Sequence, residues 1–205
     1  MPDFLTVRSA CLVFGLALVV VFAPRVAGAH EFVVDLRGVG AERDAIVSDA
    51  LRGFLLATVE RDGHANEESN GHLGGLDVYI IPRPARVAAG FPQLKQPPGA
   101  RPDIVAVMGP SDDVADEVEL IGVQGVVVRP GVLHRDNRWT MDPAQDPDAF
   151  AARYVREFGQ PPGEWAARGY NLARRIEAAI RPLGGVNDRV ALERAFADSA
   201  EGIRW

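Results

Sequence analysis

The sequence predicts an α/β fold with a mostly parallel sheet flanked by helices. Short β-rich runs alternate with stretches of helical periodicity, which is the order found in parallel α/β sheets. The run at 103–108 is apolar on both faces, as expected for a central strand that helices cover. The length suits one hydrophobic core, so a single α/β domain is expected over residues 30–205.

The first 29 residues are predicted to be a signal peptide. A nearly wholly apolar run at 10–23 is followed by a small-x-small cleavage site at 27–29, directly before His30. The run is short for a membrane span, although an uncleaved N-terminal anchor is the alternative. We therefore expect an exported, periplasmic protein.

Charge and cysteine content exclude several classes of protein. The whole sequence carries a net charge of −6, and residues 30–205 carry −7, because the leader holds Asp3, Arg8 and Arg25. An acidic exported domain is not expected to bind nucleic acid or anionic membrane surfaces. Residues 30–205 contain no cysteine, so neither disulfides nor thiolate chemistry are expected.

The first half of the domain is expected to open with a strand, a long helix and a second strand. The strands are predicted at 32–36 and 76–82, where β-branched and aromatic residues cluster. The helix is predicted over 41–61 from the spacing of its apolar residues, with Gly53 as a close-packing point. The polar, Gly-rich stretch at 62–75 is typical of a loop.

A proline-rich surface loop at 83–101 is predicted to lead into the apolar strand at 103–108. Ser111 can cap a helix over 112–121, because its hydroxyl can accept a hydrogen bond from an amide of the first turn. A fourth strand is predicted at 123–128, where three valines precede a proline.

The last part of the chain is predicted to be helical. Residues 135–147 form a polar connector, and helices are expected at 147–158, 165–181 and 190–197 from periodicity and capping residues. Trp205 is expected to be frayed.

Several motifs together resemble one family. Residues 53–57 form a Gly-x-x-Leu-Ala helix motif, and residues 109–111 are Gly-Pro-Ser after a strand. Residues 150–173 fit an aromatic pattern followed by Gly-Tyr-x-Ala, with matches at Phe150, Tyr154, Phe158, Gly159, Pro162, Gly169, Tyr170 and Ala173. The chain thereby resembles the type I periplasmic solute-binding proteins of ABC importers, of the leucine/isoleucine/valine-binding family, with Asn171 where Asp is more usual.

The resemblance implies two α/β lobes around a ligand cleft, yet this chain is short for both. Only about fifteen residues stand between 132 and 148, where the family inserts its whole second lobe. We therefore expect a single lobe: a strand/helix core at 30–134, a connector at 135–147 in place of the second lobe, and returning helices at 148–200.

Four residues are predicted to bind a ligand: Ser111, Asp112, Arg129 and Tyr170. The resemblance implies a carboxylate held at the helix start of Ser111, where unpaired amides and the helix dipole favour an anion. Asp112 would repel that anion, so a plain helix cap is the alternative role of Ser111. Arg129 follows a strand at the edge where open α/β sheets bind ligands. Tyr170 is expected to approach the same edge, with packing on its helix as the alternative.

A metal site is the less favoured possibility. His30, His64 and His72 are imidazole ligands near acidic residues, but their spacing matches no standard site. No cofactor is expected.

The expected function is non-covalent binding of a small polar solute, such as an amino acid or amide, for an ABC-type uptake system. Its partners would be an ABC permease or another exported protein. An accessory protein is the alternative, because loss of a lobe would leave an apolar patch suited to a homodimer or to docking. No enzymatic activity is expected, since the nucleophile-elbow, Walker and dinucleotide motifs are missing.

Overall fold

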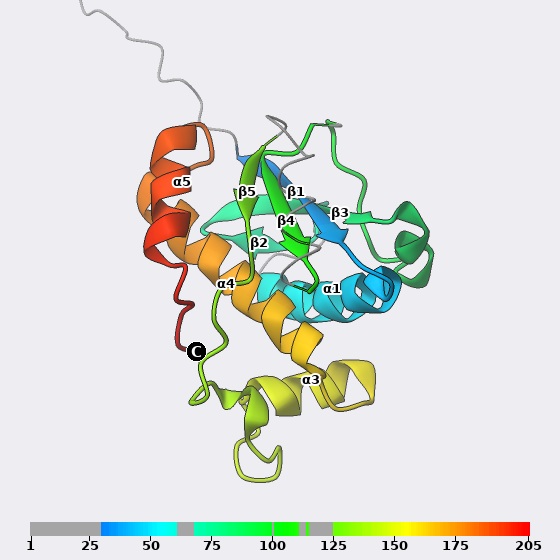
Figure 1. Cartoon of the computed structure of the whole chain (residues 1–205). Helices are drawn as coiled ribbons and strands as arrows, with labels where there is room; N and C mark the ends of the chain where they lie inside the picture. Colours follow the sequence, from blue (N-terminus) through cyan, green and yellow to red (C-terminus); the bar gives the residue numbers. More distant parts are fainter. Residues whose placement is uncertain (1–29, 61–67, 100, 111–113, 115–124) are drawn as a thin grey trace, which may run out of the picture.

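The computed structural model describes residues 30–60, 68–99, 101–110, 114 and 125–205. Within them one five-stranded sheet has the order β2-β3-β1-β4-β5 (Figure 1). The strands are β1 (Glu31–Gly38), β2 (His72–Leu73), β3 (Leu76–Arg83), β4 (Ile104–Met108) and β5 (Val126–Val128).

The sheet is mostly parallel, as predicted. β1 pairs in parallel with β3 and β4, and β4 pairs in parallel with β5. Every residue of β4 is buried, which agrees with its apolar sequence on both faces. The α/β fold class with flanking helices is therefore confirmed.

The loop predicted at 62–75 contains the short strand β2, which pairs antiparallel with β3. Two residues are too few to show strand alternation, so this pairing left no signal in the sequence. Two buried hydrogen bonds connect Asn70, which precedes β2, to α1 and β3. Thr58 Oγ1 of α1 donates to the carbonyl of Asn70 at 2.6 Å, and Asn70 Oδ1 accepts from the amide of Ile80 in β3 at 3.0 Å.

The helices follow the predicted order. They are α1 (Arg43–Val59), α3 (Phe150–Phe158), α4 (Glu164–Leu183) and α5 (Arg189–Asp198), with short 3₁₀ turns η1 (Ala85–Gly90) and η2 (Arg138–Thr140). Of the helix predicted at 112–121, only Val114 belongs to the described residues, and it is helical. No described helix combines the length and the apolar character that a membrane crossing requires.

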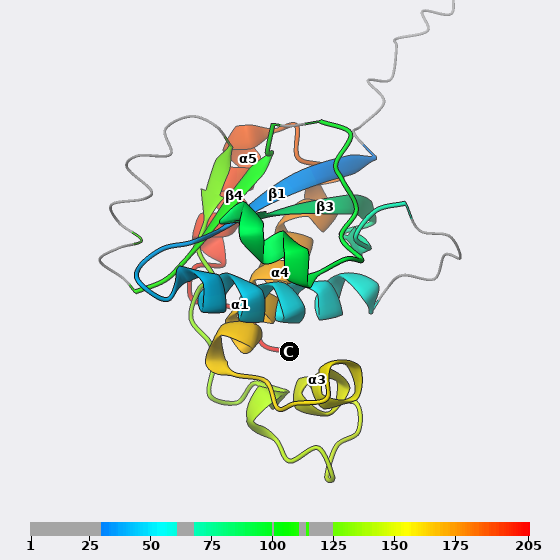
Figure 2. The same ribbon diagram turned by 90° about the vertical axis from the view of Figure 1, so that its right-hand side faces the viewer.

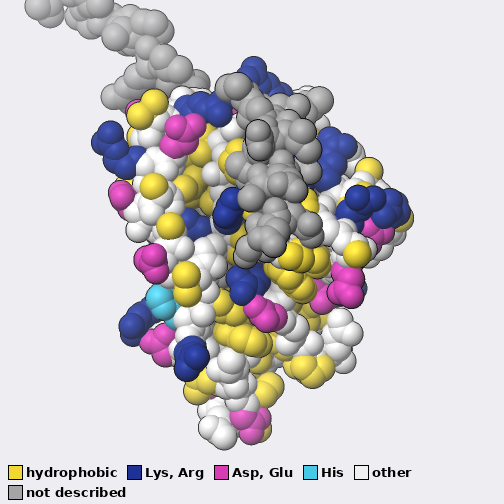
Figure 3. Space-filling model, in the orientation of Figure 1, with side chains coloured by type: hydrophobic (Ala, Val, Ile, Leu, Met, Phe, Trp, Pro, Cys, Tyr) yellow, Lys and Arg dark blue, Asp and Glu magenta, His cyan; other side chains and the backbone are white. Residues whose placement is uncertain are grey.

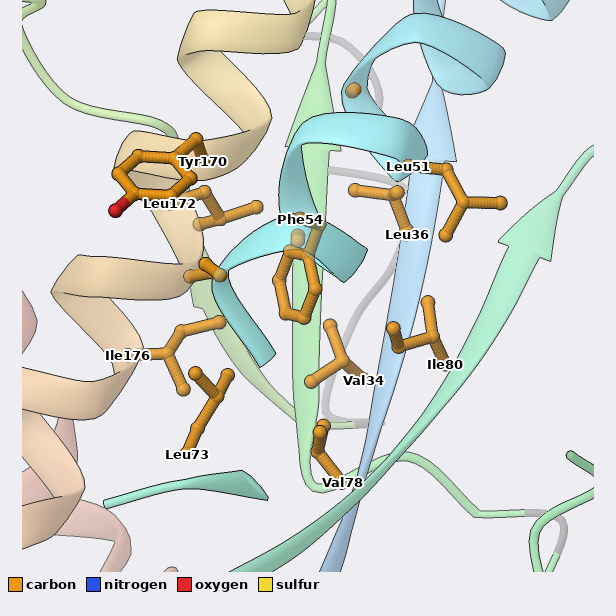
Figure 4. Close-up of a cluster of buried hydrophobic side chains, with 14 of the residues drawn as sticks. Val34, Leu36, Leu51, Phe54, Leu73, Val78, Ile80, Tyr170, Leu172 and Ile176 are labelled. Atoms are coloured by element: carbon orange, nitrogen blue, oxygen red, sulfur yellow. The ribbon is translucent and has the colours of Figure 1, made fainter. Parts of the chain in front are cut away.

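The main core lies between one face of the sheet and the pair α1 and α4. Phe54 of α1 and Leu172 and Ile176 of α4 meet the inward side chains of β1 and β3 (Figure 4). The cluster drawn there includes Val34, Leu36, Leu51, Leu73, Val78 and Ile80, all at most 2% exposed. This burial is the main stabilising contribution to the fold.

Two glycines allow α1 and α4 to approach at backbone distance. A Cβ atom on Gly53 would lie 1.8 Å from the carbonyl oxygen of Ala166, and one on Gly169 would lie 2.0 Å from that of Ala50. Gly53 is thus the close-packing point that its place in the helix predicted.

Residues 133–163 extend beyond α1 and α4, and carry α3 with them (Figures 1 and 2). The segment after α5 lies against the start of this extension, with the amide of Val132 donating to the carbonyl of Ala200 at 3.3 Å. The expectation that Trp205 is frayed is wrong: its Nε1 donates to Asn171 Oδ1 at 2.8 Å, and its ring lies 4.6 Å from that of Tyr170. A large aromatic side chain that finds both a ring and a buried amide is held in place.

Candidate functional site

A pocket of about 670 Å³ lies beside the ends of β4 and β5 and against α4 and α5. In parallel α/β sheets this carboxyl edge is where ligands bind. The residues that line it are Val107, Gly109, Val114, Val127, Val128, Arg129, Pro130, Gly131, Val132, Trp165, Arg168, Arg175, Glu193, Phe196, Ala197 and Ala200. On this side of the molecule, basic side chains lie among hydrophobic ones where β5 runs toward α4 (Figure 3). The volume suits a small organic molecule.

Arg175 is the buried polar group of this pocket. Its side chain comes from the middle of α4, and the residue is only 3% exposed. Nη2 donates to the carbonyl of Phe196 at 2.7 Å, Nε donates to Ser199 Oγ at 3.2 Å, and Nη1 donates to the carbonyl of Arg129. Burial lowers the pKa of Arg175. The guanidinium thus joins β5, α4 and α5 at the pocket wall.

Gly131 leaves room for that guanidinium. Its φ of +75° is favourable for glycine, and a Cβ atom there would lie 2.9 Å from Nη1 of Arg175. A side chain at this position would therefore press on the arginine from the pocket side.

Arg129, predicted from its place after a strand, lines the pocket and is exposed. No described carboxylate forms an ion pair with its side chain. Its own carbonyl receives a hydrogen bond from Arg175. The structure therefore brings a predicted and an unpredicted arginine to one site.

The remaining charged groups of the pocket are already paired. Arg168 donates to Glu164 at 2.6 and 2.8 Å and lies over the ring of Trp165, 5.6 Å from its centre. Glu193 accepts from Nε of Arg189 at 3.0 Å. Among the described residues, the exposed Arg129, which has no acid partner there, and the buried Arg175 therefore dominate the charge of the site.

Tyr170 is not among the residues that line this pocket. It is 3% exposed, and its hydroxyl is directed away from the core cluster (Figure 4). The hydroxyl donates to Glu60 Oε2 at 2.8 Å and accepts from Arg153 Nη2 at 3.0 Å. Burial is the main reason that the pKa of Tyr170 rises to about 12. The position of Tyr170 agrees with the alternative role given for it above, which is packing and not ligand binding.

Ser111 and Asp112 lie outside the described residues. Gly109, which precedes them in the sequence, lines the pocket.

The histidines predicted as metal ligands are not gathered into a site by the described residues. His72 Nε2 lies 2.8 Å from Asp77 Oδ1, His30 is exposed, and His64 lies outside the described part of the chain. Nowhere in the described ranges do three His, Cys, Asp or Glu side chains stand close enough to hold a metal ion.

A second buried charge, Asp35, lies in the middle of the sheet and away from the pocket lining. It is 2% exposed and accepts from Arg37 Nε at 3.0 Å and Nη2 at 2.8 Å, while Arg83 Nε stands 3.5 Å away. The ion pairs join β1 to β3 on the face opposite α1 and α4. We therefore assign Asp35 a structural role within the sheet and not a role in binding a ligand.

Sequence reasoning missed Arg175, although a signal exists. Arg175 stands three residues after Leu172 and four before Ala179, both buried on the sheet-facing side of α4. A charged residue on the apolar stripe of a helix marks a buried group that must be met by hydrogen bonds, by an ion pair or by a ligand.

No protein-family model and no curated protein sequence matches this chain. Among solved structures, a loose likeness exists to a branched chain amino acid ABC transporter periplasmic ligand-binding protein from Burkholderia xenovorans LB400. The identity is 15%, the TM-score is 0.23, and the match covers 82% of this chain and 45% of the other. The chain thus spans less than half the length of that protein, and a likeness at this level does not establish a common fold.

Proposed function

We propose that this chain is a periplasmic, solute-binding-like component of an ABC-type uptake system, which holds a small polar solute without turning it over. The pocket beside β4 and β5 carries this proposal. It lies at the ligand-binding edge of an open parallel sheet, and its size, apolar walls and few convergent polar groups are those of small-molecule sites. The polar end of an amino acid or an amide would form hydrogen bonds with these polar groups.

A single lobe would contact its solute from one side only and leave the other side open to solvent. Binding by one wall buries less of a ligand than closure of two lobes, so the affinity of the isolated chain is expected to be modest. An ABC permease or another exported protein could supply the second wall and raise that affinity.

A ligand screen tests the proposal. The purified protein is screened by thermal shift and calorimetry against amino acids, their amides and the matching carboxylates at millimolar concentration. We expect at least one class to raise the melting temperature, because a ligand that binds only the folded state stabilises it. If no compound binds, the solute-binding function is wrong. Fractionation of cells that express the whole chain tests export separately.

The alternatives receive less support. The large hydrophobic side chains that are exposed, Val59, Val132, Met141, Leu183 and Val190, come from separate segments of the chain. Exposed hydrophobic residues of this kind are ordinary on a protein surface, so we advance no dimer or docking partner from them. The metal-binding alternative lacks a cluster of ligands within the described residues.

A further inference from the structure

Basic side chains outnumber acidic ones among the described residues of the pocket. Arg129, Arg168 and Arg175 line it, and of the described lining residues Glu193 alone is acidic. Arg168 is offset by Glu164 on the preceding turn of α4. Within the described part of the chain, two arginines that line the pocket therefore have no acidic partner, although the whole sequence has a net charge of −6.

Of these two arginines, Arg175 is the better candidate to bind an anion, because its charge is buried. All three of its nitrogen atoms donate to neutral acceptors, two backbone carbonyls and a serine hydroxyl. Such dipoles stabilise a guanidinium but leave its charge in place, and a buried charge is costly unless an opposite charge meets it. Each terminal nitrogen carries a second hydrogen, so the fork can still donate toward the pocket.

From this arrangement we propose that the pocket selects small organic anions, namely carboxylates with a branched or aromatic hydrocarbon part, and that Arg175 and Arg129 bind the carboxylate. A guanidinium presents parallel N–H groups that match two carboxylate oxygens. The inference rests on the proposed solute-binding function, for which it names the class of solute.

Among the described residues that line the pocket, a ligand's ammonium group finds no unpaired acid. Glu193, the acidic residue of the described lining, already accepts from Arg189 on the preceding turn of α5. A zwitterionic amino acid would lose hydration of its ammonium without gaining an ion pair, and it would bring that charge near two arginines. Carboxylates without an amino group are therefore favoured over amino acids.

The apolar walls of the pocket favour a ligand that carries a hydrocarbon chain or ring next to its carboxylate. Val107 and Val127 from the sheet, Trp165 from α4 and Phe196 from α5 all line the pocket. Each methylene of a ligand that is buried in such walls tightens binding roughly fourfold. A branched or aromatic chain therefore binds more tightly than a short one such as acetate.

Three ligands of one skeleton test the selectivity: isocaproate, leucine and isocaproamide. Leucine adds an ammonium to isocaproate, and isocaproamide removes the charge while keeping the shape. Calorimetry on the purified protein is expected to show that isocaproate binds roughly tenfold more tightly, or better, than either analogue, because hydrogen bonds between charged groups are stronger than those to a neutral amide.

Variants assign the effect to the arginines. Arg129→Gln is the main variant, because Arg129 is exposed and its loss should leave the fold intact. We expect roughly a tenfold loss of isocaproate affinity and little change for isocaproamide. Arg175→Lys keeps the charge but not the fork, and its melting temperature reports any damage to the fold. Arg181→Gln, an exposed arginine of α4 outside the pocket lining, is the control and should change neither affinity.

The outcomes separate this inference from the function itself. If leucine or isocaproamide binds as tightly as isocaproate, the preference for carboxylates is wrong while solute binding stands. The same conclusion follows if Arg129→Gln weakens the amide and the carboxylate equally. If nothing in the wider screen binds, the solute-binding function itself fails.

Discussion

At the scale of single residues, two buried polar groups of α4 have different roles. Arg175 meets only neutral acceptors and faces the pocket, whereas Tyr170 is fully engaged on the other side of the helix by Glu60 and Arg153. A sequence shows that both are polar residues on a helix with apolar neighbours. It does not show which partner each one meets, because Glu60 lies 110 positions away along the chain.

Tyr170 is expected to ionise late and to make the fold sensitive to alkali. Its pKa is about 12 in the folded chain, against an ordinary value of 10.0, with burial as the largest cause and the charge of Glu60 as the next. Because the folded value is raised, this contribution to stability is complete below pH 10 and is lost as the pH rises through about 12. The difference corresponds to roughly 3 kcal/mol at most.

Ultraviolet difference spectra of tyrosinate formation measure this step, and Tyr170→Phe should remove it. A wild-type titration in which every tyrosine ionises near pH 10 would contradict the expectation. Burial also raises the pKa of Tyr154, so the Phe variant is required to assign the step.

Glu60 gives a prediction at acid pH. Burial raises its pKa above the ordinary value of 4.5, although Tyr170 and Arg153 act in the opposite direction. A raised carboxyl pKa means that its contribution to stability is fully present below 4.5 and is lost as the pH rises through the folded value. The wild type should therefore gain stability relative to Glu60→Gln as the pH falls toward 4.5.

Urea unfolding of both proteins across this range measures the difference. Burial also raises the pKa of Asp103, but Asp103 titrates in both proteins and its contribution cancels. A difference that is constant with pH would show that Glu60 titrates at its ordinary pKa.

At the scale of elements, the crossing of α1 and α4 is the most constrained contact. Gly53→Ala or Gly169→Ala would place a methyl group within 2.0 Å of a carbonyl oxygen of the other helix. The helices must then separate, and we expect a loss of about 1–3 kcal/mol or more in the free energy of unfolding. Gly90→Ala is the matched control, because nothing lies within 4 Å of the added atom. Chemical denaturation of the three variants checks this, and equal stability of all three would refute the close crossing.

The elements were largely predictable because their signals are local. The strands at β1, β3 and β4 and the helices α1, α4 and α5 were expected within a few residues, since apolar spacing and capping residues mark them. β2 was not, because its two residues are a strand only through pairing with β3. In the site, Arg129 could be predicted from its place after a strand, whereas the approach of Arg175 to it depends on how α4 packs.

At the scale of the whole molecule, Asn171 connects three distant segments. It is fully buried, and its Nδ2 donates to the carbonyl of Pro130 at 2.8 Å, at the start of the chain that leads to residues 133–163. Its Oδ1 accepts from Nε1 of Trp205, which holds the segment after α5 in place. The segment that leads into the extension, α4 and the C-terminal segment therefore meet at one amide, beside the pocket that Pro130 lines.

Asn171→Ala should loosen this junction and cost about 2–4 kcal/mol, because it leaves a buried carbonyl and an indole N–H without partners. Asn171→Asp separates the two halves of the amide: the carboxylate still accepts from Trp205 but faces the carbonyl of Pro130 with no hydrogen to donate. Its loss at neutral pH should be at least as large, and should shrink as acid restores a donor. Urea unfolding followed by tryptophan fluorescence measures both, with the exposed Asn187→Ala as control. If Asn171→Ala is as stable as that control, the junction contributes nothing, and residues 133–163 are held by other contacts, namely the aromatic contacts of Phe150 with Tyr170 and Trp205 and the hydrogen bonds between Asn137 and Trp205 and between Arg138 and Trp205.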